Sequence, residues 1–87
     1  MEQFRNRIIA TLASMDQISG DRLESLRASV DADADFVDLE MDSLTALDFC
    51  VGLEDAIGGA IEPADLVEHP SINALARHLA KTRGAPV

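Results

Sequence analysis

The sequence predicts an all-α fold: a small bundle of three main helices and one short helix, with a long loop between helices 1 and 2. Apolar residues recur at steps of three and four in three separate stretches, which is the spacing of one helix face. We find no stretch in which apolar and polar residues alternate as they do in a strand. The 87 residues suffice for one domain, which we assign to residues 1–83.

The first helix is predicted to end near Met15 or Asp16. Its apolar face consists of Phe4, Ile8, Ile9, Leu12 and Met15. Arg5 and Arg7 are expected on the polar side.

The connection that follows is predicted to be mostly irregular and to cross over the bundle. Ser19-Gly20-Asp21 is a turn signal, and Asp21 can cap a short helical turn through Leu23 and Leu26. Residues 31–35 alternate Asp with Ala and read as a solvated loop. The apolar residues behind this loop are expected to turn inward and anchor it on the core: Phe36, Val37 and Leu39.

The second main helix is predicted to begin at Asp42 or Ser43, either of which is a good N-cap, and to end at Gly58-Gly59. Gly52 is expected to permit close packing. The predicted apolar face comprises Leu44, Leu47, Cys50 or Val51, Leu53 or Glu54, and Ile57.

Two more helices are predicted in the C-terminal third. Pro63 suits the first turn of a short helix, which His69-Pro70 ends. Ser71 caps the last helix, whose apolar face carries Ile72, Leu75 and Leu79. Residues 84–87 are expected to be a flexible tail.

Composition argues against several classes of function. The net charge of −9 repels nucleic acid and anionic lipid and attracts basic partners. Only 3% of the residues are aromatic, so stacking platforms for single-stranded nucleic acid are scarce. Cys50 is the single cysteine, and we see no apolar run near the roughly 20 residues of a membrane span. We expect a cytoplasmic, discrete and monomeric protein.

The segment from residue 36 to residue 44, FVDLEMDSL, resembles the acyl carrier and peptidyl carrier family. The family's hallmark is Asp-Ser-Leu at the start of the second helix, matched by Asp42-Ser43-Leu44. The upstream Phe and Leu of the family also match, but Glu40 stands where the family usually has Gly. Residues 66–76, LVEHPSINALA, resemble the end of such domains in polyketide synthases and peptide synthetases.

The resemblance implies that Ser43 receives 4'-phosphopantetheine from coenzyme A through a phosphopantetheinyl transferase. The thiol of this arm would carry acyl intermediates as thioesters, so the protein itself is expected not to be an enzyme. Asp42 would assist recognition by the transferase, and Leu44 would belong to the same attachment site. We expect a polyketide-type acyl carrier, with a peptidyl or aminoacyl carrier as the second interpretation.

Partner enzymes such as an acyltransferase or a ketosynthase are expected to dock through basic patches. In the family an acidic face of the second helix serves this purpose, here represented by Asp48, Glu54 and Asp55. Asp48 and Asp55 are two turns apart and share a face, which is equally compatible with a merely solvated surface. Met41 and Leu44 flank the serine and are interpreted as partner contacts, with core packing as the alternative.

Other interpretations remain open. Asp31, Asp33 and Asp35 have the spacing of a calcium loop, but Phe36 stands where that loop needs Gly and Asp42 where it needs Glu. An enzyme would need His69 or His78 near Cys50 or Ser43. We expect Cys50 to be a buried small hydrophobe. A plain helical interaction module, in which Ser43 only caps a helix, is the third alternative.

Overall fold

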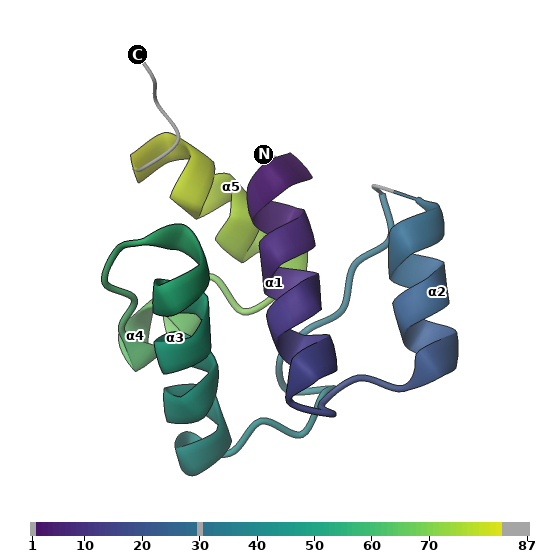
Figure 1. Ribbon diagram of the computed structural model, residues 1–87, viewed down its shortest axis with the longest axis horizontal. Helices are drawn as coiled ribbons and strands as arrows, with labels where there is room; N and C mark the ends of the chain where they lie inside the picture. The colour runs from purple at the N-terminus through teal and green to yellow at the C-terminus, as the bar shows by residue number, and fades with distance from the viewer. Residues whose placement is uncertain (1, 30, 83–87) are drawn as a thin grey trace.

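The computed structural model describes residues 2–29 and 31–82 and confirms the all-α fold class (Figure 1). The described residues form five helices and no strand. The helices are α1 (Glu2–Ser14), α2 (Gly20–Ala28), α3 (Ser43–Ile57), α4 (Pro63–Glu68) and α5 (Ile72–Thr82). The predicted tail, residues 84–87, lies outside the described residues.

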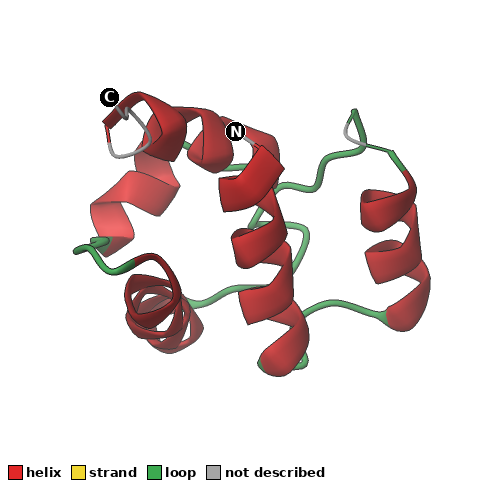
Figure 2. Cartoon of the chain, turned by 45° about the horizontal axis from the view of Figure 1, so that its top comes forward, coloured by secondary structure: helices red, strands yellow, loops and turns green. Residues whose placement is uncertain are grey.

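Helix α1 is the central element of the bundle. It packs against α3 on one side and against α5 on another, while α4 contacts α3. Helix α2 stands at the edge of the molecule, as both ribbon views show (Figures 1 and 2). The fully buried side chains that hold these helices together are Ile8, Ile9, Leu12, Leu26, Phe49, Cys50, Leu53, Ile72, Leu75 and Leu79.

The apolar face predicted for α1 is confirmed, but the prediction that Arg5 lies on the polar side is wrong. Arg5 is 2% exposed. Its Nε donates to Oδ1 of Asn73 at 2.7 Å, and its guanidinium also donates to the carbonyls of Ser29 (3.0 Å) and Ala32 (2.7 Å). A planar group with five donors can be buried when the surrounding acceptors satisfy it. Arg5 therefore ties α1 to α5 and to the connection after α2.

The predicted long loop contains a complete helix, α2, where the sequence suggested a short helical turn. Ser19, not Asp21, is its N-cap, and the Ser19 side chain accepts from the Arg22 amide. Only Leu26 of this helix is buried, and Leu23 packs against the core from a half-buried position. With so few inward contacts, α2 lacked the apolar periodicity by which longer helices are recognised.

The turn after the acidic loop buries two of its three predicted anchors. Phe36 and Leu39 are buried, but Val37 is 81% exposed, so its predicted inward position is wrong. Hydrogen bonds from Leu39 to the carbonyl of Phe36 and from Glu40 to that of Val37 wind this segment into a helical turn. Phe36 and Leu39 are three residues apart and therefore lie on the same side of this turn, whereas Val37 faces outward.

Glu40 adopts a left-handed backbone conformation, with φ of 56°. A side chain in this region costs roughly 1 to 2 kcal/mol, which glycine avoids. Since Glu40 is exposed, we expect Glu40→Gly to raise the free energy of unfolding by about 1 kcal/mol, measured by urea denaturation. Asp38→Gly, in the same turn without positive φ, is the control and should not stabilise. Equal effects of the two changes would contradict this account.

Helix α3 buries part of the predicted apolar face: Cys50 and Leu53, each given as one of two alternatives, are buried. Its fully buried residues are Phe49, Cys50 and Leu53, and the ring centroid of Phe49 lies 5.6 Å from that of Phe36. Three residues assigned to the apolar face are exposed instead: Leu44 by 76%, Leu47 by 50% and Val51 by 60%.

Packing of α3 against α1 confirms the expectation for Gly52. A Cβ built on it would lie 3.1 Å from Cγ2 of Thr11 on α1. The absence of a side chain therefore lets the two helices approach closely.

The two C-terminal helices begin as predicted, and α4 also ends at the predicted His69-Pro70. Pro63 opens α4, and the carboxylate of Asp65 accepts from the Glu62 amide at 3.0 Å. Ser71 caps α5, because its Oγ accepts from the Ala74 amide at 3.1 Å. The amide of Phe36 also donates to the carbonyl of Pro70 at 2.8 Å, which fixes the turn before α3 against the α4–α5 junction.

Candidate functional site

Ser43 is the first residue of α3 and is exposed. The N-cap is Asp42, whose Oδ1 accepts from the Thr45 amide at 2.8 Å. Within the part of the chain that the structure describes, the Ser43 hydroxyl forms no hydrogen bond. Because Asp42 performs the capping, the Ser43 hydroxyl is available for another purpose.

Hydrogen bonds at the start of α3 lower the pKa of Asp42 below 3.8, chiefly the bond from the Thr45 amide, then one from the Thr45 side chain. A carboxylate with a lowered pKa stabilises the folded state above its unfolded pKa, and that contribution disappears as the pH falls through the folded pKa. We therefore expect Asp42→Asn to remove part of the acid sensitivity of stability below about pH 4. Circular dichroism melts between pH 2 and 7 measure this, with Asp38→Asn as control. An unchanged pH profile in Asp42→Asn would refute it.

A hollow of about 510 Å³ lies beside Ser43, between the turn before α3, the first turns of α3, and α4. Apart from Asp42 and Ser43, every residue that lines it is apolar. We call it the apolar groove. Its rim includes Val37, Leu47 and Val67, and its floor includes the buried Phe36 and Leu66.

An exposed strip of Leu44, Leu47 and Val51, the apolar stripe, runs along the outer face of α3. At about 100° per residue, the stripe lies between Ser43 on one side and the exposed Asp48 and Asp55 on the other. Asp55 borders α1, where it shares a shallow hollow with Thr11.

A comparison with protein-family models gives one match, to the phosphopantetheine attachment site, over residues 6–79. The chain belongs to this family. It is a phosphopantetheine carrier domain, and the prosthetic group of such domains is a covalent 4'-phosphopantetheine. Carrier domains are in general non-catalytic and are served by a phosphopantetheinyl transferase and by biosynthetic enzymes. Searches of curated proteins and of solved structures gave no match.

The residues of the carrier domain fit a covalently attached arm at the start of α3. Attachment needs an accessible hydroxyl with room around it, and Ser43 has both. A helix N-terminus also tolerates a phosphate, although Asp42 already uses the Thr45 amide. The groove beside the serine offers apolar surface next to the point of attachment.

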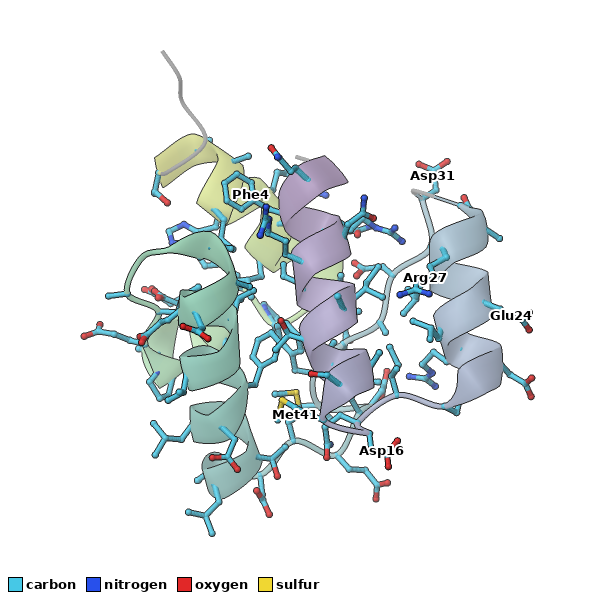
Figure 3. The ribbon with its side chains drawn as sticks, viewed as in Figure 1. Phe4, Asp16, Glu24, Arg27, Asp31 and Met41 are labelled. Atoms are coloured by element: carbon cyan, nitrogen blue, oxygen red, sulfur yellow. The ribbon has the colours of Figure 1, made fainter. Side chains whose placement is uncertain are left out.

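Two of the predicted partner residues already make contacts within the carrier domain. Glu54 is half-buried, and its Oε2 accepts from the Ile61 amide at 2.8 Å. Met41, labelled in Figure 3, is half-buried and packs against the core. It also lines the apolar groove. Leu44 is exposed, as a contact residue must be. Val37 and Val67 are exposed on the rim of the groove and were not among the predicted site residues, because their position depends on how the turn and α4 pack together.

The calcium alternative receives no support. Oδ1 of Asp33 accepts from the amides of Ala34 and Asn73, each at 2.9 Å. Among the described residues, no three His, Cys, Asp or Glu side chains are grouped so that they could hold a metal ion.

The catalytic alternatives also lack support. Cys50 is 1% exposed, as predicted, and burial, followed by the charges of Glu54 and Asp65, raises its pKa to about 11. Little of this thiol is therefore the reactive thiolate at neutral pH. His69 and His78 stack on each other, with ring centroids 4.0 Å apart.

None of the described helices combines the length and the apolar character that a membrane span requires.

Proposed function

We propose that Ser43 bears the phosphopantetheine arm and that the domain carries acyl groups as thioesters between the enzymes of a polyketide-type pathway. The observation that carries this proposal is the free, exposed hydroxyl of Ser43 at the start of α3, on the edge of the apolar groove. A hydroxyl that neither caps the helix nor bonds to its neighbours is suited to modification.

The surroundings of Ser43 suit a docking enzyme with a basic surface. All seven Lys and Arg residues lie at or before Arg27 or at or after Arg77, so the whole region between them carries only acidic charge. The apolar stripe supplies a contact surface that binding can desolvate, and Asp48 and Asp55 supply an acidic border. We assign Asp42 to recognition by the transferase, because its carboxylate adjoins the acceptor hydroxyl.

The apolar groove favours acyl cargo without charge. The interior of the bundle is filled by Phe49, Leu53 and their neighbours, whereas the groove is open to solvent beside the point of attachment. We infer that an apolar chain on the arm lies in this groove and not within the core. An aminoacyl cargo is the second candidate, since an ammonium group would be attracted to the acidic surroundings of Ser43.

The function is tested by loading the arm from hexanoyl-coenzyme A and from an aminoacyl-coenzyme A. A hexanoyl chain should add its mass, return to the holo mass with hydroxylamine, and shift the methyl NMR signals of Val37, Leu66 and Val67. Loading without any shift of these methyl signals would reject the groove as the cargo site. Resistance of the acyl group to hydroxylamine would reject the thioester.

Replacing an exposed leucine of α3 should affect arm transfer, whereas replacing a buried one should affect stability. We expect Leu44→Ala to change the free energy of unfolding by less than about 0.5 kcal/mol, because Leu44 is 76% exposed. It should slow arm transfer by a transferase about tenfold, as the loss of a contact worth about 1.4 kcal/mol does. Leu53→Ala, at a fully buried position, should cost about 2 to 5 kcal/mol. Transfer to Leu44→Ala at the native rate would remove the stripe from the docking surface.

A further inference from the structure

A second hollow, of about 230 Å³, lies between the end of α4 and the last turns of α5. Its lining consists of His69, Ala74, Arg77, His78 and Lys81. Four of these five residues have basic side chains and none is acidic, in a chain whose net charge is −9. We call this feature the basic hollow; it shares no lining residue with the apolar groove.

The cations of the basic hollow are not committed to other groups. Arg77 and Lys81 are both exposed, and within the described residues neither forms an ion pair or a side-chain hydrogen bond. Two other arginines are engaged, Arg5 in the buried network and Arg7 with the carbonyl of Ala56, whereas Arg22 and Arg27 on α2 are exposed. The basic hollow therefore presents donors without acceptors.

The two histidines are held in a fixed arrangement. Their rings stack with an interplanar angle of 17°, and His78 Nε2 lies 4.0 Å from Oδ1 of Asp65. The stack positions two imidazoles, one from α5 and one from the residue that follows α4, on the same hollow as the two permanent cations.

We propose that the basic hollow binds a phosphate-class anion, either inorganic phosphate or a phosphomonoester. Arg77 supplies a guanidinium whose forked donors match two phosphate oxygens, and Lys81 supplies a compact charge one helical turn away.

A simpler role for these cations is to stabilise the C-terminal end of α5, where the helix dipole favours positive charge. The two roles make different predictions. Dipole stabilisation needs no ligand and is weakened by any salt. A binding site responds to phosphate in a saturable way, and more strongly than to chloride at equal ionic strength.

The test is an NMR titration of the full chain with sodium phosphate at pH 7, at constant ionic strength held with sodium chloride. We expect saturable shifts of the His69 and His78 ring signals, with a Kd on the order of millimolar. Phenyl phosphate in a parallel titration distinguishes the ligand source: tighter binding than phosphate indicates a phosphomonoester, and equal or weaker binding indicates the free ion.

The matched variants are Arg77→Gln with Lys81→Gln, and Arg22→Gln with Arg27→Gln on α2. Both pairs remove two exposed cations, but only the first should weaken phosphate binding, by about tenfold or more. Circular dichroism verifies that each variant is folded. Unsaturable shifts, or equal weakening by both pairs, would overturn the proposal and leave the cations to the helix dipole.

Discussion

Ser43→Ala should abolish uptake of the phosphopantetheine arm and leave the fold intact. The hydroxyl is the proposed acceptor, so its removal leaves no oxygen for the phosphodiester at this position. Because Asp42 caps α3 and the Ser43 hydroxyl makes no hydrogen bond in the described structure, the free energy of unfolding should change by less than about 0.5 kcal/mol. Intact mass and urea denaturation of the same sample measure both effects.

Two controls separate chemistry from structure in this experiment. Thr45→Ala removes a hydroxyl in the same helical turn and should accept the arm as the native chain does. Asp42→Asn keeps the acceptor but removes the carboxylate assigned to transferase recognition, so it should slow loading without preventing it. Complete loading of Ser43→Ala would exclude Ser43 as the acceptor.

Arg5→Ala should produce the largest loss of stability among single changes at polar residues. It removes the guanidinium from Oδ1 of Asn73 and from the carbonyls of Ser29 and Ala32, although the Ser29 carbonyl still accepts from the Ala32 amide. A hydrogen bond to a charged group contributes about 1.5 to 3 kcal/mol, so the loss of several should total about 2 to 5 kcal/mol. A chain of this length has roughly 5 to 13 kcal/mol of stability in total, so the variant should be far less stable.

Arg5→Lys and Arg22→Ala make this result interpretable. Lysine retains the charge but cannot reach several acceptors as the planar guanidinium does, so most of the loss should remain. Arg22 is exposed, and its replacement by Ala should change the free energy of unfolding by less than about 0.5 kcal/mol. Urea denaturation measures all three variants. A loss below about 1 kcal/mol in Arg5→Ala would show that the buried network contributes little net stability.

The helices with strong local signals were predictable from the sequence. Helix α3 has Asp42 at its start and a Gly at its end, where Gly58 has a φ of 74°. Helix α4 begins with Pro63, and Ser71 caps α5. These signals act within one turn of chain, so they are legible without tertiary contacts. Helix α2 has only one buried residue, and its extent was therefore not predictable.

Which residues lie inside depends on contacts between distant segments, so several burial predictions made from the sequence were wrong. Arg5 is buried because Asn73, 68 residues away, accepts its hydrogen bond. Leu47 was placed on the predicted core face, yet Phe49 packs inside against Phe36, and Leu47 lies outside with Leu44 and Val51. The sequence pattern indicated Ser43 as the site, but the groove beside it is formed in part by α4, whose packing the pattern does not predict.

The most direct test of the central claim is fragmentation mass spectrometry of the full chain after incubation with coenzyme A, magnesium and a broad-specificity phosphopantetheinyl transferase. We expect one arm per chain, located on the fragment that contains Ser43, and no added mass in Ser43→Ala. No added mass in the folded native chain, or an arm located on any other residue, would contradict it.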